Sequence, residues 1–189
     1  AASNPTNTAW AAYSGTDSAG TPGTRNSTYQ DLLVEGFESG ASGWQILSNP
    51  NSQNSSSNVA GILTSSTYSH SGAKTFRFSS YYSASSSGGD YTQYLISPEL
   101  SVQSGDSLAF WYRSYYGSES FQVGVSTTDS LPASFTFGSS NTASSTQTRF
   151  SLDLSANAGQ NVFVAIKYTS SYAYYMYIDD ITGPAIVYP

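Results

Sequence analysis

Short apolar runs separated by turn residues recur along this sequence, and they are the feature that most restricts its fold. Within each run, apolar and polar residues alternate with a period of two, which is typical of strands rather than helices. Turn signals such as Ser71–Gly72, Tyr116–Gly117 and Ala158–Gly159 interrupt the runs. The spacing, roughly 8–12 residues between runs, favours an all-β jelly-roll β-sandwich with two antiparallel sheets.

The alternation also predicts where the strands and the core lie. No helix is expected beyond a single turn within 154–159. The core should come from the aliphatic and aromatic rows, each side chain of which stabilises the fold by roughly 1.5–3 kcal/mol on burial. These rows are Leu108, Phe110 and Tyr112; Phe121, Val123 and Val125; Val162, Val164 and Ile166; Tyr174, Met176 and Ile178. The expected strands are 32–38, 43–48, 59–64, 74–80, 91–97, 107–115, 119–127, 134–138, 147–154, 161–169 and 172–181.

The chain has 189 residues, enough for one β domain with a sizeable core. Residues 1–30 are mostly small and polar with Pro and Gly, the composition of a linker, although Trp10 and Tyr13 are able to pin such an arm to the domain. We therefore expect a polar arm at 1–30, the sandwich at 31–184 and a C-terminal tail at 185–189. No signal-peptide pattern or membrane-spanning apolar run is expected from the sequence.

Charge and cysteine usage exclude several functions. The formal net charge is −6 with only six Lys and Arg residues, so a phosphate backbone would be repelled, and anionic membranes are disfavoured. The chain has no cysteine, which excludes disulfides and thiol chemistry. Its 16 tyrosines suit sheets with one solvated face, because tyrosine combines an apolar ring with a polar tip.

Acidic residues at the ends of two strands predict a cation site. Asp179 and Asp180 are adjacent, and neighbouring carboxylates destabilise a strand unless something neutralises them. Glu38 ends the first predicted strand, so we expect the first and last strands to lie side by side with these acids around a cation. Ca²⁺ takes about six to eight oxygen ligands, and the turn at Ser71 would add backbone carbonyls. The alternative is that the acids are solvated or cap a turn.

Aromatic residues at strand ends and in loops predict a carbohydrate-binding surface. Exposed tyrosine rings stack on the C–H faces of sugars, while polar side chains contact the hydroxyls. A neutral or weakly acidic sugar would suit this surface better than a heavily sulfated one. The alternative is that the rings only pack against the sheet. The predicted residues are Tyr81, Tyr82, Arg113, Tyr115, Tyr116, Tyr174 and Tyr175.

We expect no catalytic site and no enzyme activity. His70 is the only histidine, and adjacent side chains on an extended strand point apart, so it is poorly placed as a base for its serine neighbours. Metalloprotease, phosphate-loop and nucleophile-elbow motifs are absent from the sequence. Paired carboxylates hydrolyse glycosides in some enzymes, but no cleft pattern encloses a pair here. An ion pair with Arg113 is the expected role of Glu119.

An ordered set of short motifs resembles the cleaved-adhesin or choice-of-anchor J domains, which are MAM-like jelly rolls found in gingipain adhesin regions. The resemblance covers about residues 34–183. In this sequence its motifs are Phe37–Glu38, Gly43–Trp44, Ser71–Gly72, Tyr94–Pro98 with Leu100, Leu108–Tyr112, Val123–Thr127, Leu152–Leu154, Ala158–Gly159, Val164–Ile166 and Tyr177–Ile181.

The resemblance implies a galactose-binding-like sandwich with structural calcium, to which Glu38, Asp179 and Asp180 correspond by position. Such modules belong to larger secreted or surface-anchored bacterial proteins, so an extracellular location is expected. The expected function is a non-catalytic carbohydrate-binding module that attaches a parent protein to a glycan or polysaccharide. The alternative is an adhesin or structural module that binds a surface protein, and a small polysaccharide hydrolase or lyase is the weakest reading.

Overall fold

The computed structural model describes residues 31–48, 60–81, 91–171 and 173–188. The expected arm at 1–30 with Trp10 and Tyr13, and the predicted site residue Tyr82, lie outside the described residues. The described part consists of strands, loops and two short 3-10 turns, η2 (Pro132–Ser134) and η3 (Ser155–Asn157). The all-β prediction is confirmed, and η3 is the single turn expected within 154–159. None of the described residues forms a helix long and apolar enough to span a membrane.

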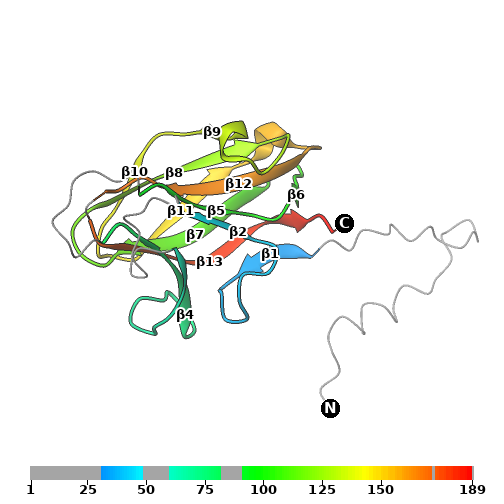
Figure 1. Cartoon of the computed structure of the whole chain (residues 1–189). Helices are drawn as coiled ribbons and strands as arrows, with labels where there is room; N and C mark the ends of the chain where they lie inside the picture. The colour runs from blue at the N-terminus through cyan, green and yellow to red at the C-terminus, as the bar shows by residue number, and fades with distance from the viewer. Residues whose placement is uncertain (1–30, 49–59, 82–90, 172, 189) are drawn as a thin grey trace, which may run out of the picture. The chain divides into compact units, whose positions relative to one another are not determined.

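The first sheet is built around β13 (Tyr175–Ile186). The strands β4 (Lys74–Ser79) and β1 (Leu32–Glu35) follow one another along one edge of β13, and β7 (Ser107–Ser114) pairs with the other edge. β3 (Gly61–Thr64) lies beyond β4, and β11 (Thr148–Asp153) lies beyond β7. All of these pairings are antiparallel. The predicted neighbourhood of the first and last strands is therefore confirmed, as Figure 1 shows for β1 and β13.

The second sheet has β12 (Asn161–Tyr168) at its centre, between β5 (Gln93–Ile96) and β8 (Glu119–Ser126). β2 (Gln45–Ser48) lies beyond β5, while β9 (Thr136–Phe137) and β10 (Asn141–Ala143) pair with β8. The short β6 (Leu100–Ser101) pairs with both β12 and β13 and so joins the two sheets. Figure 1 shows β8 and β12 above β13 and β1.

The strand boundaries differ from the predictions at a few places. β6 and β10 were not predicted, because two or three residues are too few to show an alternation. β1 ends at Glu35 rather than at residue 38, since Phe37 has a φ of 60°, which interrupts an extended strand. β13 runs on to Ile186, so residues 185 and 186, which the sequence assigned to a tail, pair with β6 instead.

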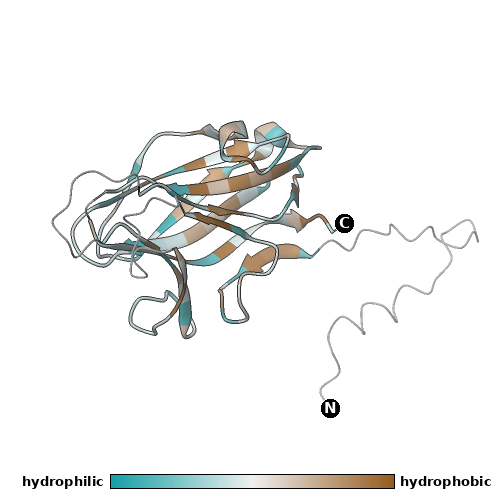
Figure 2. Cartoon of the chain, in the orientation of Figure 1, coloured by the Kyte–Doolittle hydropathy of each residue, from teal (hydrophilic) through white to brown (hydrophobic). Residues whose placement is uncertain are grey.

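The predicted aliphatic rows form the core between the two sheets. Phe110, Phe121, Val164, Met176 and Ile178 are at most 1% exposed. These residues come from β7, β8, β12 and β13, so each sheet contributes its inward face. Figure 2 shows the hydrophobic segments along the strands of both layers. Tyr112 and Val125 are only partly buried and pack at the edge of this core. Tyr174, which the alternation placed in the same row as Met176 and Ile178, precedes β13 and is 39% exposed, so its assignment to the core was wrong.

A buried polar network crosses the core at the end nearest the start of β13. Glu119 is fully buried and accepts hydrogen bonds from the Tyr168 hydroxyl and from the Tyr174 backbone N–H, both at 2.7 Å. The Tyr168 hydroxyl also lies 2.8 Å from the Ser80 hydroxyl. The expected ion pair between Glu119 and Arg113 does not form, because Glu119 points inward, where these donors satisfy it. Burial, followed by the nearby Glu119 carboxylate, raises the pKa of the Tyr168 phenol.

Alkaline pH is expected to destabilise the domain through Tyr168. The folded state keeps this phenol neutral, whereas the unfolded chain ionises near the ordinary value of about 10. Because the folded pKa is the higher one, the contribution to stability is complete below about pH 10 and is lost as the pH rises further. Urea unfolding at a series of pH values above about 10 would measure the decrease in the free energy of unfolding.

The variant Y168F is expected to lose less stability than the wild type at alkaline pH, because it lacks the phenol that ionises. It should also cost about 1–3 kcal/mol near neutral pH, because Glu119 loses a buried donor. Y188F alters an exposed tyrosine and serves as the control. Equal slopes above about pH 10 in wild type and Y168F would contradict the assignment.

Candidate functional site

Tyrosine rings from four segments gather at one end of the first sheet. They come from the β7–β8 turn, the start of β13, the residue pair after β4 and the loop 65–73. Ring centroids lie 5.3 Å apart for Tyr81 and Tyr174, and 5.8 Å apart for Tyr115 and Tyr174. We call this cluster the tyrosine surface, and its members are Tyr68, Tyr81, Tyr115, Tyr116, Tyr174, Tyr175 and Tyr177.

The tyrosine surface has a buried floor and an exposed rim. Tyr177 is 2% exposed, and the ring of Tyr68 stacks on it at 4.6 Å with an angle of 2° between the planes. Burial, and then the neighbouring Tyr68 phenol, raises the pKa of Tyr177. By contrast, Tyr116 is 71% exposed, Tyr115 43% and Tyr174 39%. The three rim rings are therefore available to a ligand, while the floor holds them in place.

Two arginines flank the floor of the tyrosine surface. Arg77 on β4 and Arg113 on β7 are both paired with Tyr177 across the sheet. The Arg77 guanidinium carbon lies 4.8 Å from the Tyr175 ring centroid, and that of Arg113 lies 5.6 Å from the Tyr68 centroid. Each arginine is thus held by a cation–π contact.

The structure brings most of the predicted binding residues together. Tyr81, Arg113, Tyr115, Tyr116, Tyr174 and Tyr175 meet on the tyrosine surface, while Tyr82 lies outside the described residues. The sequence analysis did not select Tyr68, Arg77 or Tyr177. Alternation marks Arg77 and Tyr177 as opposite to the core residues Phe76 and Ile178, but only strand pairing places them side by side. Nothing in the sequence around Tyr68 indicates its contact with Tyr177.

The carboxylates of Asp179 and Asp180 anchor the loop 65–73. Asp179 Oδ2 accepts hydrogen bonds from the backbone N–H groups of His70 at 2.7 Å and Ser71 at 3.2 Å. The carboxylate of Asp180 receives the Ser71 hydroxyl at 2.8 Å and lies 2.6 Å from His70 Nδ1. The His70 ring also stacks on Trp111 at 4.0 Å. Three of the predicted metal residues therefore meet at this loop.

Glu38, the fourth predicted metal residue, holds the other end of the same loop. Its carboxylate accepts the backbone N–H groups of Ala73 and Lys74, both at 2.7 Å. The carboxylate lies against Gly72, whose φ is +63°, and a Cβ at this position would collide with it. Glycine is therefore required at this turn for both its conformation and its lack of a side chain.

Glu35 is a further acid at this site, and the sequence analysis did not select it as a metal ligand. It shares the inward face of β1 with buried Leu33, and this alternation was the available signal. Burial raises the pKa of Glu35, and the charge of Asp179 adds to that shift. Burial likewise raises the pKa of Asp179, with the neighbouring Asp180 charge contributing last. Among the described residues, the contact between His70 Nδ1 and the Asp180 carboxylate is the only one with ion-pair geometry.

The oxygen atoms of these acids are suitable ligands for a hard cation such as Ca²⁺, but the side chains alone are too far apart to hold one. Carboxylate oxygens are the ligands that Ca²⁺ prefers, and negative charge is concentrated here. In the described part of the chain no lysine or arginine forms an ion pair with these carboxylates, although Lys74 Nζ donates to the Glu38 backbone carbonyl at 2.7 Å. Within the described ranges, however, no three His, Asp or Glu side chains are grouped closely enough to hold a metal ion. A calcium ion would therefore need backbone carbonyls beside the carboxylates.

Comparison with known proteins identifies the fold. No family model and no curated protein matches the sequence. Among solved structures, the K1 cleaved adhesin domain of Lys-gingipain from Porphyromonas gingivalis W83 superposes with a TM-score of 0.68 at 20% identity, over 83% of this chain and 99% of that one. The carbohydrate-binding module TmCBM61, solved with β-1,4-galactotriose, gives 0.56 at 14% identity over 79% and 94%. The CBM22-1 xylan-binding domain of Paenibacillus barcinonensis Xyn10C gives 0.53 at 8% over 85% and 97%.

At these identities the likeness concerns the fold alone. It confirms the resemblance drawn from the ordered motifs, since cleaved adhesin domains recur among the matches. The chain has the antiparallel β-sandwich fold that cleaved adhesin domains share with carbohydrate-binding modules.

Proposed function

We propose that this domain is a non-catalytic binding module that attaches to a glycan through the tyrosine surface. The observation that carries the proposal is the continuous rim of exposed rings formed by Tyr115, Tyr116 and Tyr174. Flat aromatic faces of this kind stack on the C–H faces of sugar rings. Support comes from the fold, which is also that of TmCBM61 and of the xylan-binding CBM22-1 domain.

The rim is preorganised, which favours the binding of a ligand that fits it. The Tyr174 backbone is fixed by its hydrogen bond to buried Glu119, and Tyr115 N–H donates to the Tyr175 carbonyl at 2.8 Å. A surface that is already ordered loses less conformational entropy when a ligand binds. The buried network thus helps to order the rim before a ligand binds.

The environment of His70 supports a non-catalytic role. Its imidazole is engaged by Asp180 and by the Trp111 ring. The neighbouring hydroxyls are engaged as well, because Ser71 donates to Asp180 and Ser69 donates to the Gly72 carbonyl. None of these serines is paired with His70 as a nucleophile with its base.

A protein partner is the second candidate, favoured by the higher TM-score of the cleaved adhesin domain. Exposed tyrosines are also common in the energetic centres of protein interfaces. On either reading, we propose that the domain works outside the cell as part of a larger protein, attaching that protein to a glycan or to a surface protein.

Truncating the rim is expected to weaken glycan binding. Y116A and Y174A should each reduce affinity for a binding polysaccharide by roughly tenfold, or about 1.4 kcal/mol, because each removes an exposed ring. Affinity electrophoresis against a panel that includes galactan and xylan measures this loss. Y188A is the matched control, since Tyr188 is 62% exposed and lies outside the tyrosine surface. Unchanged retention in both rim variants would contradict the site.

We also propose that calcium stabilises the loop 65–73. The predicted ligands are Glu38, Asp179, Asp180 and Ser71, which bind or form part of this loop. In the observed arrangement at most two of the carboxylates would contact one ion, and backbone carbonyls of the turn would supply the other oxygens. The ion would neutralise the negative charge that now surrounds Asp179. Its role is structural, because these residues hold the loop that carries Tyr68.

Removing calcium is expected to lower the melting temperature. A site saturated 100-fold above its dissociation constant stabilises the folded state by about 2.7 kcal/mol, so chelator and excess calcium should give clearly different thermal transitions. D179N should abolish that difference, whereas D153N, an exposed acid elsewhere, should preserve it. Identical melting with chelator and with calcium would remove the calcium proposal and leave glycan binding to its own test.

A further inference from the structure

Resting on the proposed function, the geometry points to a uronate-containing glycan as the ligand class, and we propose that Arg77 and Arg113 bind its carboxylates. The sugar rings would stack on the exposed rim while the two guanidinium groups contact the charged substituents. This assignment goes beyond a generic sugar, because it adds a recognition element that a neutral glycan does not use.

The two arginines are placed symmetrically about one buried ring. Both are paired with Tyr177, Arg77 from β4 on one side and Arg113 from β7 on the other. They are therefore separated by two strand spacings, about 10 Å across the sheet. Both side chains are partly exposed on the outward face of the sheet, next to the exposed rim of the tyrosine surface.

Neither arginine has a carboxylate partner in the described part of the chain. The one contact with ion-pair geometry there joins His70 and Asp180. Glu119, the expected partner of Arg113, is buried against Tyr168 instead. Arg113 Nε donates only to the Ser114 carbonyl, at 3.3 Å. In a chain with six Lys and Arg residues and a net charge of −6, two arginines without acidic partners beside a row of rings are a specific arrangement.

The contacts that these arginines do make orient them. A cation–π contact holds each guanidinium near a tyrosine face and leaves its N–H groups able to donate. The planar guanidinium donates two parallel hydrogen bonds to one carboxylate, a geometry that an ammonium group does not provide. Arginine at both positions therefore matches a planar anionic group.

A uronate fits better than a densely sulfated chain. The net charge of −6 repels every polyanion at long range, and this repulsion grows with the number of charges on each sugar. A uronate bears one charge on each sugar ring and retains C–H faces for stacking. Two uronate carboxylates, one at each arginine, would thus match the two positive charges of the surface.

The test compares uronate oligosaccharides with their carboxyl-reduced counterparts, which keep the chain and lose the charge. Calorimetry with oligogalacturonides and alginate oligosaccharides should show at least tenfold tighter binding than with the reduced forms. R77Q and R113Q should each reduce the ratio between the two affinities severalfold. Because both arginines also contact rings of the tyrosine surface, this ratio within each variant is the readout, and not its absolute affinity. R113K, which keeps the charge but loses the planar fork, should fall between R113Q and wild type.

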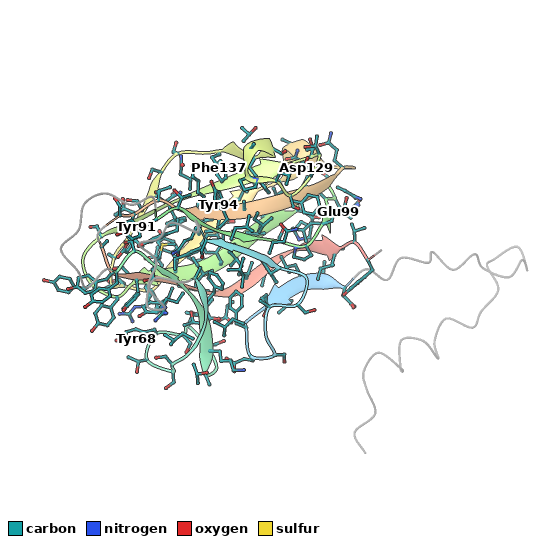
Figure 3. All side chains as sticks on the ribbon, in the orientation of Figure 1. Tyr68, Tyr91, Tyr94, Glu99, Asp129 and Phe137 are labelled. Atoms are coloured by element: carbon teal, nitrogen blue, oxygen red, sulfur yellow. The ribbon has the colours of Figure 1, made fainter. Side chains whose placement is uncertain are left out.

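K167Q is the matched control, since it removes one positive charge from the second sheet, where Lys167 Nζ lies 5.1 Å from the Phe137 ring. Figure 3 shows Phe137 and Tyr68 on opposite sides of the sandwich. Equal binding of charged and reduced oligosaccharides, or an equal loss in K167Q, would overturn the uronate assignment while glycan binding stands. Failure of every glycan to bind, with rim variants that behave as wild type, would overturn the proposed function itself.

Discussion

The site depends on the way the carboxylate of Asp179 holds a loop against the outer face of the first sheet. The pairing of β13 with β7 shifts register between Asp179 and Thr182, and Asp180 has a φ of 47° there. This irregularity lets two adjacent acids both face the loop 65–73. Their hydrogen bonds to His70 and Ser71 fix the loop, and the same loop carries Tyr68 onto Tyr177. The tyrosine surface is thus built on an acidic anchor.

The acidic anchor and the tyrosine surface differ in their exposure to water. The carboxylates lose hydration on burial, which raises the pKa of both Glu35 and Asp179, and backbone N–H groups compensate only in part. The rim rings remain in water and lose that contact only when a ligand covers them. A bound cation would stabilise the acidic anchor and leave the rim rings exposed. Its role would therefore differ from that of a ligand, which would cover the rim.

The sequence predicted long strands better than short ones. Strands of six to eight residues, such as β7, β8 and β12, show enough alternation to reveal both their position and their buried face. β6 has two residues and is defined only by its neighbours β12 and β13. The end of β1 was misplaced because the left-handed conformation of Phe37 has no signature in residue type.

The sequence by itself determined the all-β class, the buried rows and most members of the tyrosine surface. These follow from local alternation and from residue chemistry, which do not require knowledge of neighbours. The pairing of the first and last strands was inferred only indirectly, from acids expected to meet, and the strand order of the structure established it. Only the tertiary structure decided that Tyr68 covers Tyr177, that Arg77 and Arg113 flank the same ring, and that Glu119 turns inward to Tyr168 instead of pairing with Arg113. Strand order and loop path set these contacts, and both arise from packing between segments far apart in the chain.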